Sequence, residues 1–391
     1  RPAKVAGFAL SFVTLASLVL AGNLTGGGSA AQGAESPATR ERPPNIVMVF
    51  ADDWGRFAGV YRQMDGPGGI NDLAVTPNMD RVAESGVVFR HAFVNAPSCT
   101  PCRSSLLSGQ YFWRTGRGAI LQGGEWDPSI PAWPLLLRDS GYQLGKMYKV
   151  WSPGRPADAP FGRQQYAFER AGNRFNQFSE NVTRSVAAGQ TTDAAKAELL
   201  EQVRQNVAAF LNNRESDKPF CFWFGPTNVH RKWKRGSGRA LWGLDPEKLR
   251  GKLPAFLPDV AEVREDLCDY LGEIAALDAA VGVLVDELKK AGEWERTVMM
   301  ISGDHGPPGF PHGKCNLYDF GTRVPLIIAG PGIRGGRVVD DFVSLPDLAP
   351  TILETAGVKV PQAMTGRSLR AQLEAPRGGQ IDPQRTWVVT G

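Results

Sequence analysis

Two cysteines stand close together in the segment SCTPCRSSLLSG, where residue types that could do chemistry are concentrated. Cys99 and Cys102 flank Thr100 and Pro101, and Arg103 follows directly. A proline between the cysteines and an arginine beside them would lower a thiol pKa, as in a dithiol redox motif at a helix N-terminus. A redox role, however, leaves the acidic clusters and histidines elsewhere in the chain without a function. The alternative is that only one of the two sulfurs is the working group.

Two acidic clusters follow apolar segments that are typical of strands buried on both faces. NIVMVF leads through an alanine into Asp52 and Asp53, and TVMMISG leads into Asp304 and His305. In open parallel sheets, ligands bind outside the carboxyl ends of the strands. Adjacent buried carboxylates repel one another, and a hard divalent cation bound by oxygens removes that cost. A metal site is therefore predicted, with N-caps and turn formers as the alternative role for these aspartates.

The chain has only four histidines, so their positions are informative. His91 lies within an apolar strand and is interpreted as a core residue. His230 follows the apolar segment PFCFWFG and its turn, while His305 and His312 flank the second acidic cluster, with Lys314 close behind. A metal, histidines and lysines on one rim suit an oxyanion ester, because cations hold the anion while histidine transfers protons.

Helical patterns alternate with short apolar strands along the chain. The sequence TPNMDRVAESG, for example, combines Thr76 as an N-cap, Pro77 at the first helical position and Gly86 as a stop. This alternation predicts an α/β fold with a mostly parallel sheet sandwiched by helices. Helices are predicted at 76–86, 100–107, 131–139, 192–213, 263–292 and 344–357, and strands at 45–50, 87–94, 141–150, 219–225, 297–303 and 324–330.

Composition and the first residues restrict the class of protein. The 391 residues carry a net charge of +4, which is too weak to indicate a nucleic-acid partner, and five cysteines are too few for a disulfide scaffold. Arg1 and Lys4 precede an apolar run and then small residues, which predicts a signal peptide over 1–34 followed by a linker over 35–44. An N-terminal membrane anchor is the alternative. The expected mature protein is exported, periplasmic or extracellular, with no membrane attachment after cleavage.

Several blocks, in order, give the chain a family resemblance from Asn45 onward. CTPCRSSLLSG matches a Cys-x-Pro-x-Arg signature that runs into a helix, and NIVMVFADD, KPFCFWFGPTNVHR, GDHG and GKCNLYDFGTRVPLIIAGPG match further blocks. The chain resembles the type I, formylglycine-dependent sulfatases of the alkaline-phosphatase superfamily, closest to the heparan N-sulfatase and iduronate-sulfatase branch. The resemblance implies a catalytic domain over 45–380, with 381–391 as the start of a truncated antiparallel C-terminal subdomain and a first strand at 386–391.

The resemblance also implies what the two sulfurs do. Cys99 would be oxidised by a formylglycine-generating maturation enzyme, and the hydrate of the resulting aldehyde would attack sulfur. Pro101 and Arg103 would belong to the maturation signal, and Arg103 would also steady the hydrate. Cys102 would then be a bystander in a position that the family often fills with serine.

The remaining site residues come from the same resemblance. One Ca²⁺ ion, or Mg²⁺, would be held with the formylglycine of Cys99 by the two acidic clusters, that is, by Asp52, Asp53, Asp304 and His305. Lys314 would contact the sulfate, His230 would lie near the leaving group, and Lys149 would bind sulfate. One departure from the family pattern follows Lys149, because Tyr148 replaces a glycine, and Trp151 or Ser152 stands where a histidine is expected.

A basic segment after His230, HRKWKRGSGRALWG, interleaves cations with tryptophans. Basic groups attract polyanions and indole faces stack on sugar rings, so Arg231, Trp233 and Arg235 are candidate substrate-binding residues, together with His312. A solvated loop with one packed tryptophan is the alternative. The expected substrate is a sulfated glycan, with O-sulfate and N-sulfate both open. A phosphate or phosphonate monoester hydrolase of the same superfamily and a non-catalytic glycan-binding relative are the competing functions.

Overall fold

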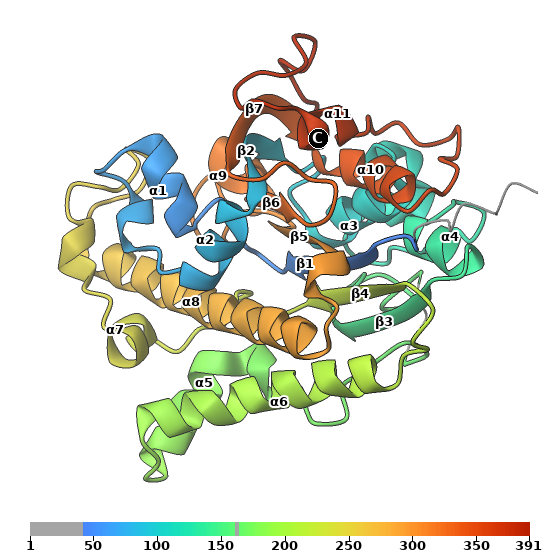
Figure 1. Cartoon of the computed structure of the whole chain (residues 1–391). Coiled ribbons are helices and arrows are strands. Elements are labelled where there is room, and N and C mark those ends of the chain that lie inside the picture. The colour runs from blue at the N-terminus through green and yellow to red at the C-terminus, as the bar shows by residue number, and fades with distance from the viewer. Residues whose placement is uncertain (1–41, 161–163) are drawn as a thin grey trace, which may run out of the picture. The chain divides into compact units, whose positions relative to one another are not determined.

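One sheet dominates the part of the chain that the computed structural model describes, residues 42–160 and 164–391 (Figure 1). Seven strands pair in the order β3-β4-β1-β5-β6-β2-β7, and within this sheet only β6 runs antiparallel to its neighbours. The predicted mostly parallel α/β sheet is therefore confirmed. The strands are β1 (Asn45–Ala51), β2 (Gly86–Phe93), β3 (Gln143–Tyr148), β4 (Phe220–Gly225), β5 (Thr297–Gly303), β6 (Leu326–Ala329) and β7 (Arg337–Ser344).

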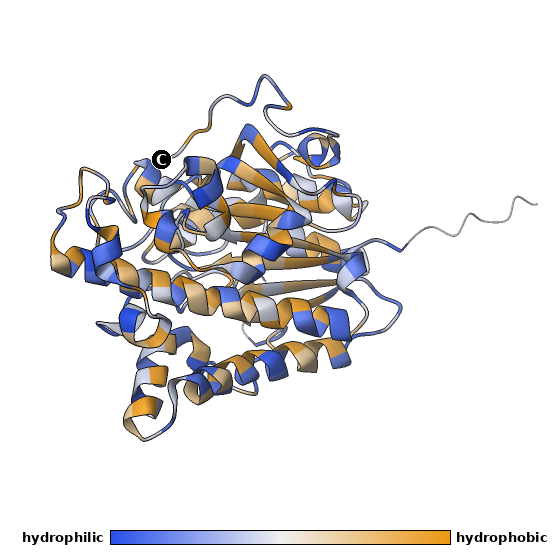
Figure 2. Ribbon diagram, turned by 60° about the vertical axis from the view of Figure 1, so that its left-hand side comes forward, coloured by the Kyte–Doolittle hydropathy of each residue, from blue (hydrophilic) through white to orange (hydrophobic). Residues whose placement is uncertain are grey.

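Helices cover both faces of this sheet, so alternate residues of each central strand point into different cores. Val47 and Val49 of β1 pack in one core, and Ile46 and Met48 pack in the other. Because both faces are buried, the strands are continuous apolar runs, which appear orange in Figure 2. The first core takes side chains from α1 (Gly59–Asp65), α2 (Pro77–Glu84), α5 (Phe178–Ala187), α6 (Thr192–Asn212), α7 (Ser237–Trp242) and α8 (Ala261–Lys290), and the second from α3 (Cys99–Ser108), α4 (Trp133–Asp139), α10 (Leu348–Thr355) and α11 (Arg370–Glu374).

The helices and strands predicted between residues 45 and 357 are all present, with ends shifted by a few residues. The sequence interpretation missed β7, because RVVDDFVS carries two aspartates inside an edge strand that is only half-buried. It also missed several short helices, among them α5. The strand expected at 386–391 is wrong, since this segment lies irregularly beside Asn95, whose amide donates to the Val389 carbonyl at 2.8 Å. The domain boundary expected at residue 380 stays a prediction.

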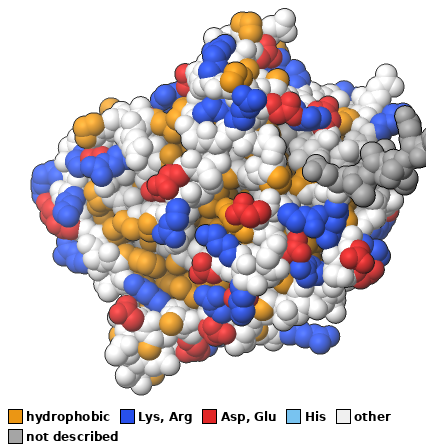
Figure 3. Space-filling view, viewed as in Figure 1, with side chains coloured by type: hydrophobic (Ala, Val, Ile, Leu, Met, Phe, Trp, Pro, Cys, Tyr) orange, Lys and Arg blue, Asp and Glu red, His pale blue; other side chains and the backbone are white. Residues whose placement is uncertain are grey.

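The surface agrees with the modest net charge. In Figure 3, Lys and Arg side chains are interspersed with Asp and Glu over the visible face, without a large field of one sign. Within the described ranges, none of the helices has the length and apolar character needed to cross a membrane. The predicted signal peptide, 1–34, and most of the predicted linker, 35–44, lie outside the described residues.

Close backbone contacts fix the end of β5 beside the turn that follows β1. A Cβ atom added at Gly303 would lie 2.0 Å from the Trp54 carbonyl oxygen, and backbone cannot move aside as the end of a flexible side chain can. We therefore expect Gly303→Ala to lower the free energy of unfolding by about 1–3 kcal/mol, measured by urea denaturation. Gly69→Ala is the matched control, because Gly69 has open space around it and should change by less than about 0.5 kcal/mol. Equal effects of the two changes would contradict the argument.

Candidate active site

Four neighbouring parallel strands bring their carboxyl ends, and the residues that follow them, to one edge of the sheet. β1 and β5 pair in register through Ala51 and Gly303, so the segment beginning at Asp52 lies beside the segment beginning at Asp304. The Asp53 N–H donates to Asp304 Oδ1 at 2.8 Å, which ties the two acidic clusters together. β3 leads into Lys149, and the loop after β4 carries His230.

Asp52 is buried at the centre of a group of cations. Its Oδ1 accepts from Lys149 Nζ at 2.6 Å and from Arg103 Nη2 at 3.2 Å. Burial opposes ionisation, yet Lys149 and Arg103 hold the pKa of Asp52 well below its ordinary value. Arg103 also donates from Nε to Asp304 Oδ2 at 2.9 Å, and in turn Asp304 and Asp52 raise the pKa of Arg103 despite its complete burial. Asp52 is therefore an ionised anchor for both cations.

Asp53 differs from Asp52, because its carboxylate is only partly satisfied. Oδ1 accepts from Lys314 Nζ at 2.8 Å and lies 3.3 Å from His305 Nε2, whereas the buried Oδ2 has no hydrogen-bond partner among the described residues. His230 Nε2 lies 3.7 Å from that oxygen. Burial raises the pKa of Asp53 to about 6, although His305 opposes the shift. A buried carboxylate oxygen without a partner is what a bound cation would satisfy.

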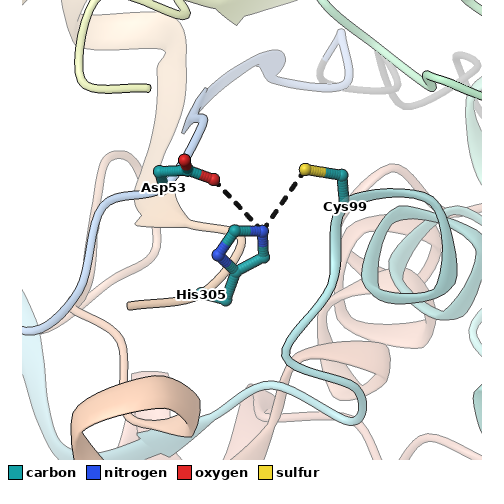
Figure 4. A group of neighbouring side chains, drawn as sticks. All are labelled: Asp53, Cys99 and His305. Carbon is teal, nitrogen blue, oxygen red and sulfur yellow. Dashed lines mark hydrogen bonds and ion pairs between the residues drawn. The ribbon is translucent and has the colours of Figure 1, made fainter. Parts of the chain in front are cut away.

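Cys99 is the first residue of α3 and points into this group (Figure 4). Its Sγ lies 3.5 Å from Asp52 Oδ1, 3.4 Å from His305 Nε2 and 3.4 Å from Lys314 Nζ. Burial, together with the nearby Asp52 charge, raises the pKa of the Cys99 thiol to about 12. The thiol is therefore protonated at neutral pH and is a poor redox nucleophile.

Cys102 faces a different environment. Its side chain is buried in the apolar core on the α3 side of the sheet, and burial raises its pKa well above the ordinary value. All five cysteines lie within the described ranges and all are free. The lowered thiol pKa on which the redox interpretation of CTPC depends is absent at both positions.

The donor atoms fit a hard divalent cation. There are three groups of three residues whose ligand atoms, within each group, lie within 4.8 Å of one another. These groups combine carboxylates with His305, Cys99 or His230. Carboxylate oxygens are the ligands that Ca²⁺ and Mg²⁺ prefer, whereas an imidazole and a thiol are softer donors, so the aspartates are what fit a hard cation here. The predicted ligands are therefore brought together: Asp52, Asp53, Cys99, Asp304 and His305, with His230 beside them.

The turn after β3 explains one departure from the family pattern. Tyr148 has φ 69°, a left-handed conformation that glycine, the residue expected here from the resemblance, adopts without strain. The Tyr148 ring packs against Phe175 and Phe224, and its N–H donates to Glu169 Oε1 at 2.8 Å. This turn directs Lys149 toward Asp52.

The two residues in the position of the expected histidine have separate environments. Trp151 is fully buried and donates from its indole N–H to Ser104 Oγ at 2.7 Å. Ser152, by contrast, lines the cavity above the site. Trp151 therefore has a packing role and transfers no proton to a substrate.

The buried carboxylates and the groups around them are called the rim below: Asp52, Asp53, Cys99, Arg103, Lys149, His230, Asp304, His305 and Lys314. A cavity of about 800 Å³ opens above the rim. Its wall includes Asp52, Lys149, Ser152 and His230 from the carboxyl edge of the sheet, and Arg231 and Lys232 from the following loop. The opposite wall was missed by sequence reasoning, since it comes from polar residues without a motif. These residues belong to the 3-10 turn Arg174–Gln177, α5 and their flanks: Asn173, Arg174, Asn176, Gln177, Glu180, Asn181 and Arg184.

Most of the predicted substrate-binding residues lie elsewhere. Trp233 packs against Tyr270 and Phe310, so its indole face is already covered, and Arg235 extends into solvent beside Glu265. His312 stacks on Tyr318 with ring centroids 3.8 Å apart. None of these three residues lines the cavity, so their substrate-binding role stays a prediction that the cavity does not support.

Arg231 does line the cavity, but its charge is already neutralised. Its guanidinium makes a bidentate pair with Asp266 at 2.9 and 2.8 Å and lies over the Trp233 ring at 4.0 Å. The same group donates to the Pro308 carbonyl. Arg231 therefore braces the loop after β4 against α8 and the loop after β5.

A buried carboxyl group supports the loop that carries His230. Glu273 of α8 accepts from the Ser179 N–H of α5 at 3.2 Å and from the Asn228 amide at 3.1 Å. Burial raises the pKa of Glu273 to about 7 from an ordinary 4.5. The Glu273 carboxyl group therefore links α5 to the loop that carries His230.

The fold and this rim of carboxylates and cations define an α/β enzyme with a site for anionic esters. A family model described as Sulfatase matches residues 44–358, and the chain belongs to the sulfatase family. The chain is a sulfuric ester hydrolase of that family.

Relatives from several organisms agree with this assignment. N-sulphoglucosamine sulphohydrolase of Homo sapiens is 29% identical over 368 residues, covering 86% of this chain and 67% of that protein. Choline-sulfatase of Rhizobium meliloti (strain 1021) is 28% identical, covering 81% of this chain and 68% of the relative. The chain thus spans about two thirds of the length of these two relatives.

Solved structures share the fold at low sequence identity. BT4656 in complex with its substrate D-glucosamine-2-N,6-O-disulfate matches with a TM-score of 0.62 and 19% identity, over 88% of this chain and 82% of that one. A phosphonate monoester hydrolase from Silicibacter pomeroyi matches with a TM-score of 0.58 and 22% identity, over 85% and 77%. The fold is therefore alkaline-phosphatase-like, as the sequence predicted.

The raised pKa of Glu273 predicts a pH dependence of stability. The folded protein keeps the Glu273 proton over a range in which the unfolded chain releases it, so this contribution is full below about pH 4.5 and is lost as the pH rises through 7. We expect the difference in unfolding free energy between the unaltered protein and Glu273→Gln to fall by about 3 kcal/mol between pH 4 and pH 8. Urea denaturation across this range measures it. The exposed Glu295→Gln is the control, and a flat difference for Glu273→Gln would refute the argument.

Proposed function

We propose that the protein hydrolyses sulfate esters or N-sulfates of a sulfated glycan, with a formylglycine made from Cys99 and a bound divalent cation, Ca²⁺ or Mg²⁺. One observation carries the proposal. The Cys99 side chain, at the start of a buried helix, meets Asp52, His305 and Lys314 within 3.5 Å. The sulfur marks the position that the aldehyde oxygen, or one hydroxyl of its hydrate, would occupy.

The ligands proposed for the cation are Asp52, Asp53, Asp304, His305 and the modified side chain at position 99. When bound, such a cation supplies charge neutralisation for the sulfuryl group and for the oxygens around it. The unpartnered Oδ2 of Asp53 supports this assignment, since it gains a ligand role without breaking a hydrogen bond.

The other side chains of the rim have separate proposed roles. Lys149 and Lys314 are ammonium groups held beside the carboxylates, where they can neutralise sulfate oxygens as charge develops in the transition state. Arg103 is too deeply buried to meet a substrate directly, and it holds Asp52 and Asp304 in place.

His230 is the proposed proton donor to the leaving group. It is more exposed than the other rim residues and lines the cavity, and burial lowers its pKa from the ordinary value. A histidine with that exposure can exchange its proton with solvent and give it to a departing oxygen or nitrogen.

Relatives support a glycan as the substrate class. N-sulphoglucosamine sulphohydrolase and the structure with D-glucosamine-2-N,6-O-disulfate both concern sulfated amino sugars by name. The chain would meet such substrates after export, for which the predicted signal peptide and an extracellular sulfatase among its relatives provide the support. A formylglycine-generating maturation enzyme is then a required partner.

A phosphonate or phosphate monoester hydrolase is the second candidate, favoured by the structural match to the Silicibacter pomeroyi enzyme. A panel of aryl sulfate, sulfated glucosamines and aryl phosphonate separates the two functions by relative kcat/KM. Binding of sulfated sugars without turnover by protein that contains formylglycine would instead indicate a non-catalytic glycan-binding relative.

The two cysteines of CTPC give a matched pair of variants for the nucleophile. We expect Cys99→Ala to lower kcat by about 10³-fold or more, because it removes the reacting group, while Cys102→Ala removes only a core side chain and keeps turnover. Mass spectrometry of the peptide with Cys99 should detect formylglycine in protein produced with a maturation enzyme. Unmodified cysteine in fully active protein would exclude this mechanism.

The metal assignment predicts a stability response that needs no turnover. Ca²⁺ at 100 times its Kd should stabilise the protein by about 2.7 kcal/mol, seen as a rise in Tm. Asp53→Asn should lose most of this response, whereas Asp278→Asn changes a buried carboxylate of α8 that caps α2 and should keep it. The assignment fails if Asp53→Asn and the unaltered protein respond alike.

A further inference from the structure

Two walls of the cavity, one from the 3-10 turn Arg174–Gln177 and α5 and the other from the loop after β4, carry charged side chains beyond those around Cys99. Arg174 and Arg184 lie on the first of these walls and Lys232 lies on the second, and among the described residues that line them Glu180 is the only carboxylate. The cavity volume of about 800 Å³ lies toward the upper end of the ~300–1,000 Å³ range of small-molecule sites, so it has room for more than one sulfate group.

Most cations that line the cavity already have a carboxylate partner. Lys149 pairs with Asp52 at 2.6 Å, and Arg231 is held by Asp266. A third pair joins Arg174 to Glu198 at 2.6 Å. These three cations are therefore neutralised before any ligand binds.

Arg184 and Lys232 are different. Neither has a carboxylate within 4.0 Å among the residues that the structure describes, although Glu180 stands one helical turn before Arg184. Two cations without a carboxylate partner that line the same cavity create a positive potential that favours an anionic ligand group. A guanidinium and an ammonium together match the oxygens of a sulfate or a carboxylate.

The wall that carries Arg184 is also held in place. The buried Asn181 accepts from Arg184 Nη1 at 3.2 Å and donates to the Arg174 carbonyl at 2.8 Å. Asn176 Oδ1 accepts from the Thr227 N–H at 2.9 Å, which ties the same wall to the loop that carries His230. A group bound at Arg184 therefore has a fixed position relative to the rim.

We infer that Arg184 and Lys232 form a second anion subsite for the same substrate molecule. It binds a further sulfate, or a uronate carboxylate, while the sulfate to be cleaved lies at the rim. The inference rests on the proposed function, because that function places the sulfate to be cleaved at the rim. The substrate class thereby narrows to glycan ends with at least two anionic groups, one of which is not cleaved at this site.

Binding to a variant that cannot turn over tests the subsite separately from catalysis. Cys99→Ala protein is titrated calorimetrically with three probes: glucosamine N-sulfate, glucosamine 2-N,6-O-disulfate, and a disaccharide of N-sulfated glucosamine and a uronate. We expect one of the doubly anionic probes to bind with an affinity about tenfold or more above that of the singly sulfated probe. The probe that does so shows whether the subsite binds a second sulfate or a uronate carboxylate. Adding Arg184→Gln or Lys232→Gln should remove most of that preference.

The matched control is Arg370→Gln on α11. Arg370 is an exposed helical arginine with a glutamate four residues away, as Arg184 is, but it lies on the helix packed with α10, outside the cavity. It should leave the preference unchanged, and Tm values verify that every variant is folded. The inference is overturned if all probes bind alike, or if the preference survives loss of both Arg184 and Lys232. If the Cys99→Ala protein shows this preference but protein that contains formylglycine never hydrolyses the probes, the subsite is kept and the proposed function is rejected.

Discussion

The neutralisation of three buried carboxylates at the ends of β1 and β5 is the constraint on which the rest of the site depends. Asp52, Asp53 and Asp304 are almost fully buried, and isolated charges at that depth would cost several kcal/mol each. Arg103 reaches two of them from α3, and Lys149 and Lys314 arrive from the loops after β3 and β5. Each cation comes from a different element, so the carboxylates draw α3 and both loops onto one edge of the sheet.

That constraint also places Cys99. Arg103 follows Cys99 by one helical turn, so a helix that directs its arginine to Asp52 and Asp304 must present position 99 to the same edge. The proposed reacting residue and the arginine that pairs with the buried carboxylates therefore lie on the same face of α3. Cys102 belongs to the adjacent core, and the resemblance of CTPC to a redox pair is a consequence of sequence spacing alone.

The sequence predicted the sheet and the rim because both have short-range signals. Apolar runs ending in aspartate fix the strand ends, and parallel pairing then brings Asp52 and Asp304 together without knowledge of any side-chain contact. The cavity wall had no such signal, since Asn181 and Arg184 belong to an ordinary polar helix. The placement of Trp233 could not be predicted for a related reason. A tryptophan among basic residues suits a glycan surface, but this ring packs on Tyr270, and sequence alone does not give its direction.

The charge balance links the rim to the outer wall. The three carboxylates are matched by Arg103, Lys149 and Lys314, and the Cys99 thiol is neutral because its pKa is raised, so the rim as described is close to electroneutral. A bound divalent cation, held by Asp52, Asp53, Asp304 and His305, would add two positive charges to this balance. Under the proposed function, an anionic ester would complete the balance at the rim, and a second anionic group would do so at the subsite proposed for Arg184 and Lys232. The proposed recognition of a multiply charged glycan would therefore depend on the same electrostatics that holds the site together.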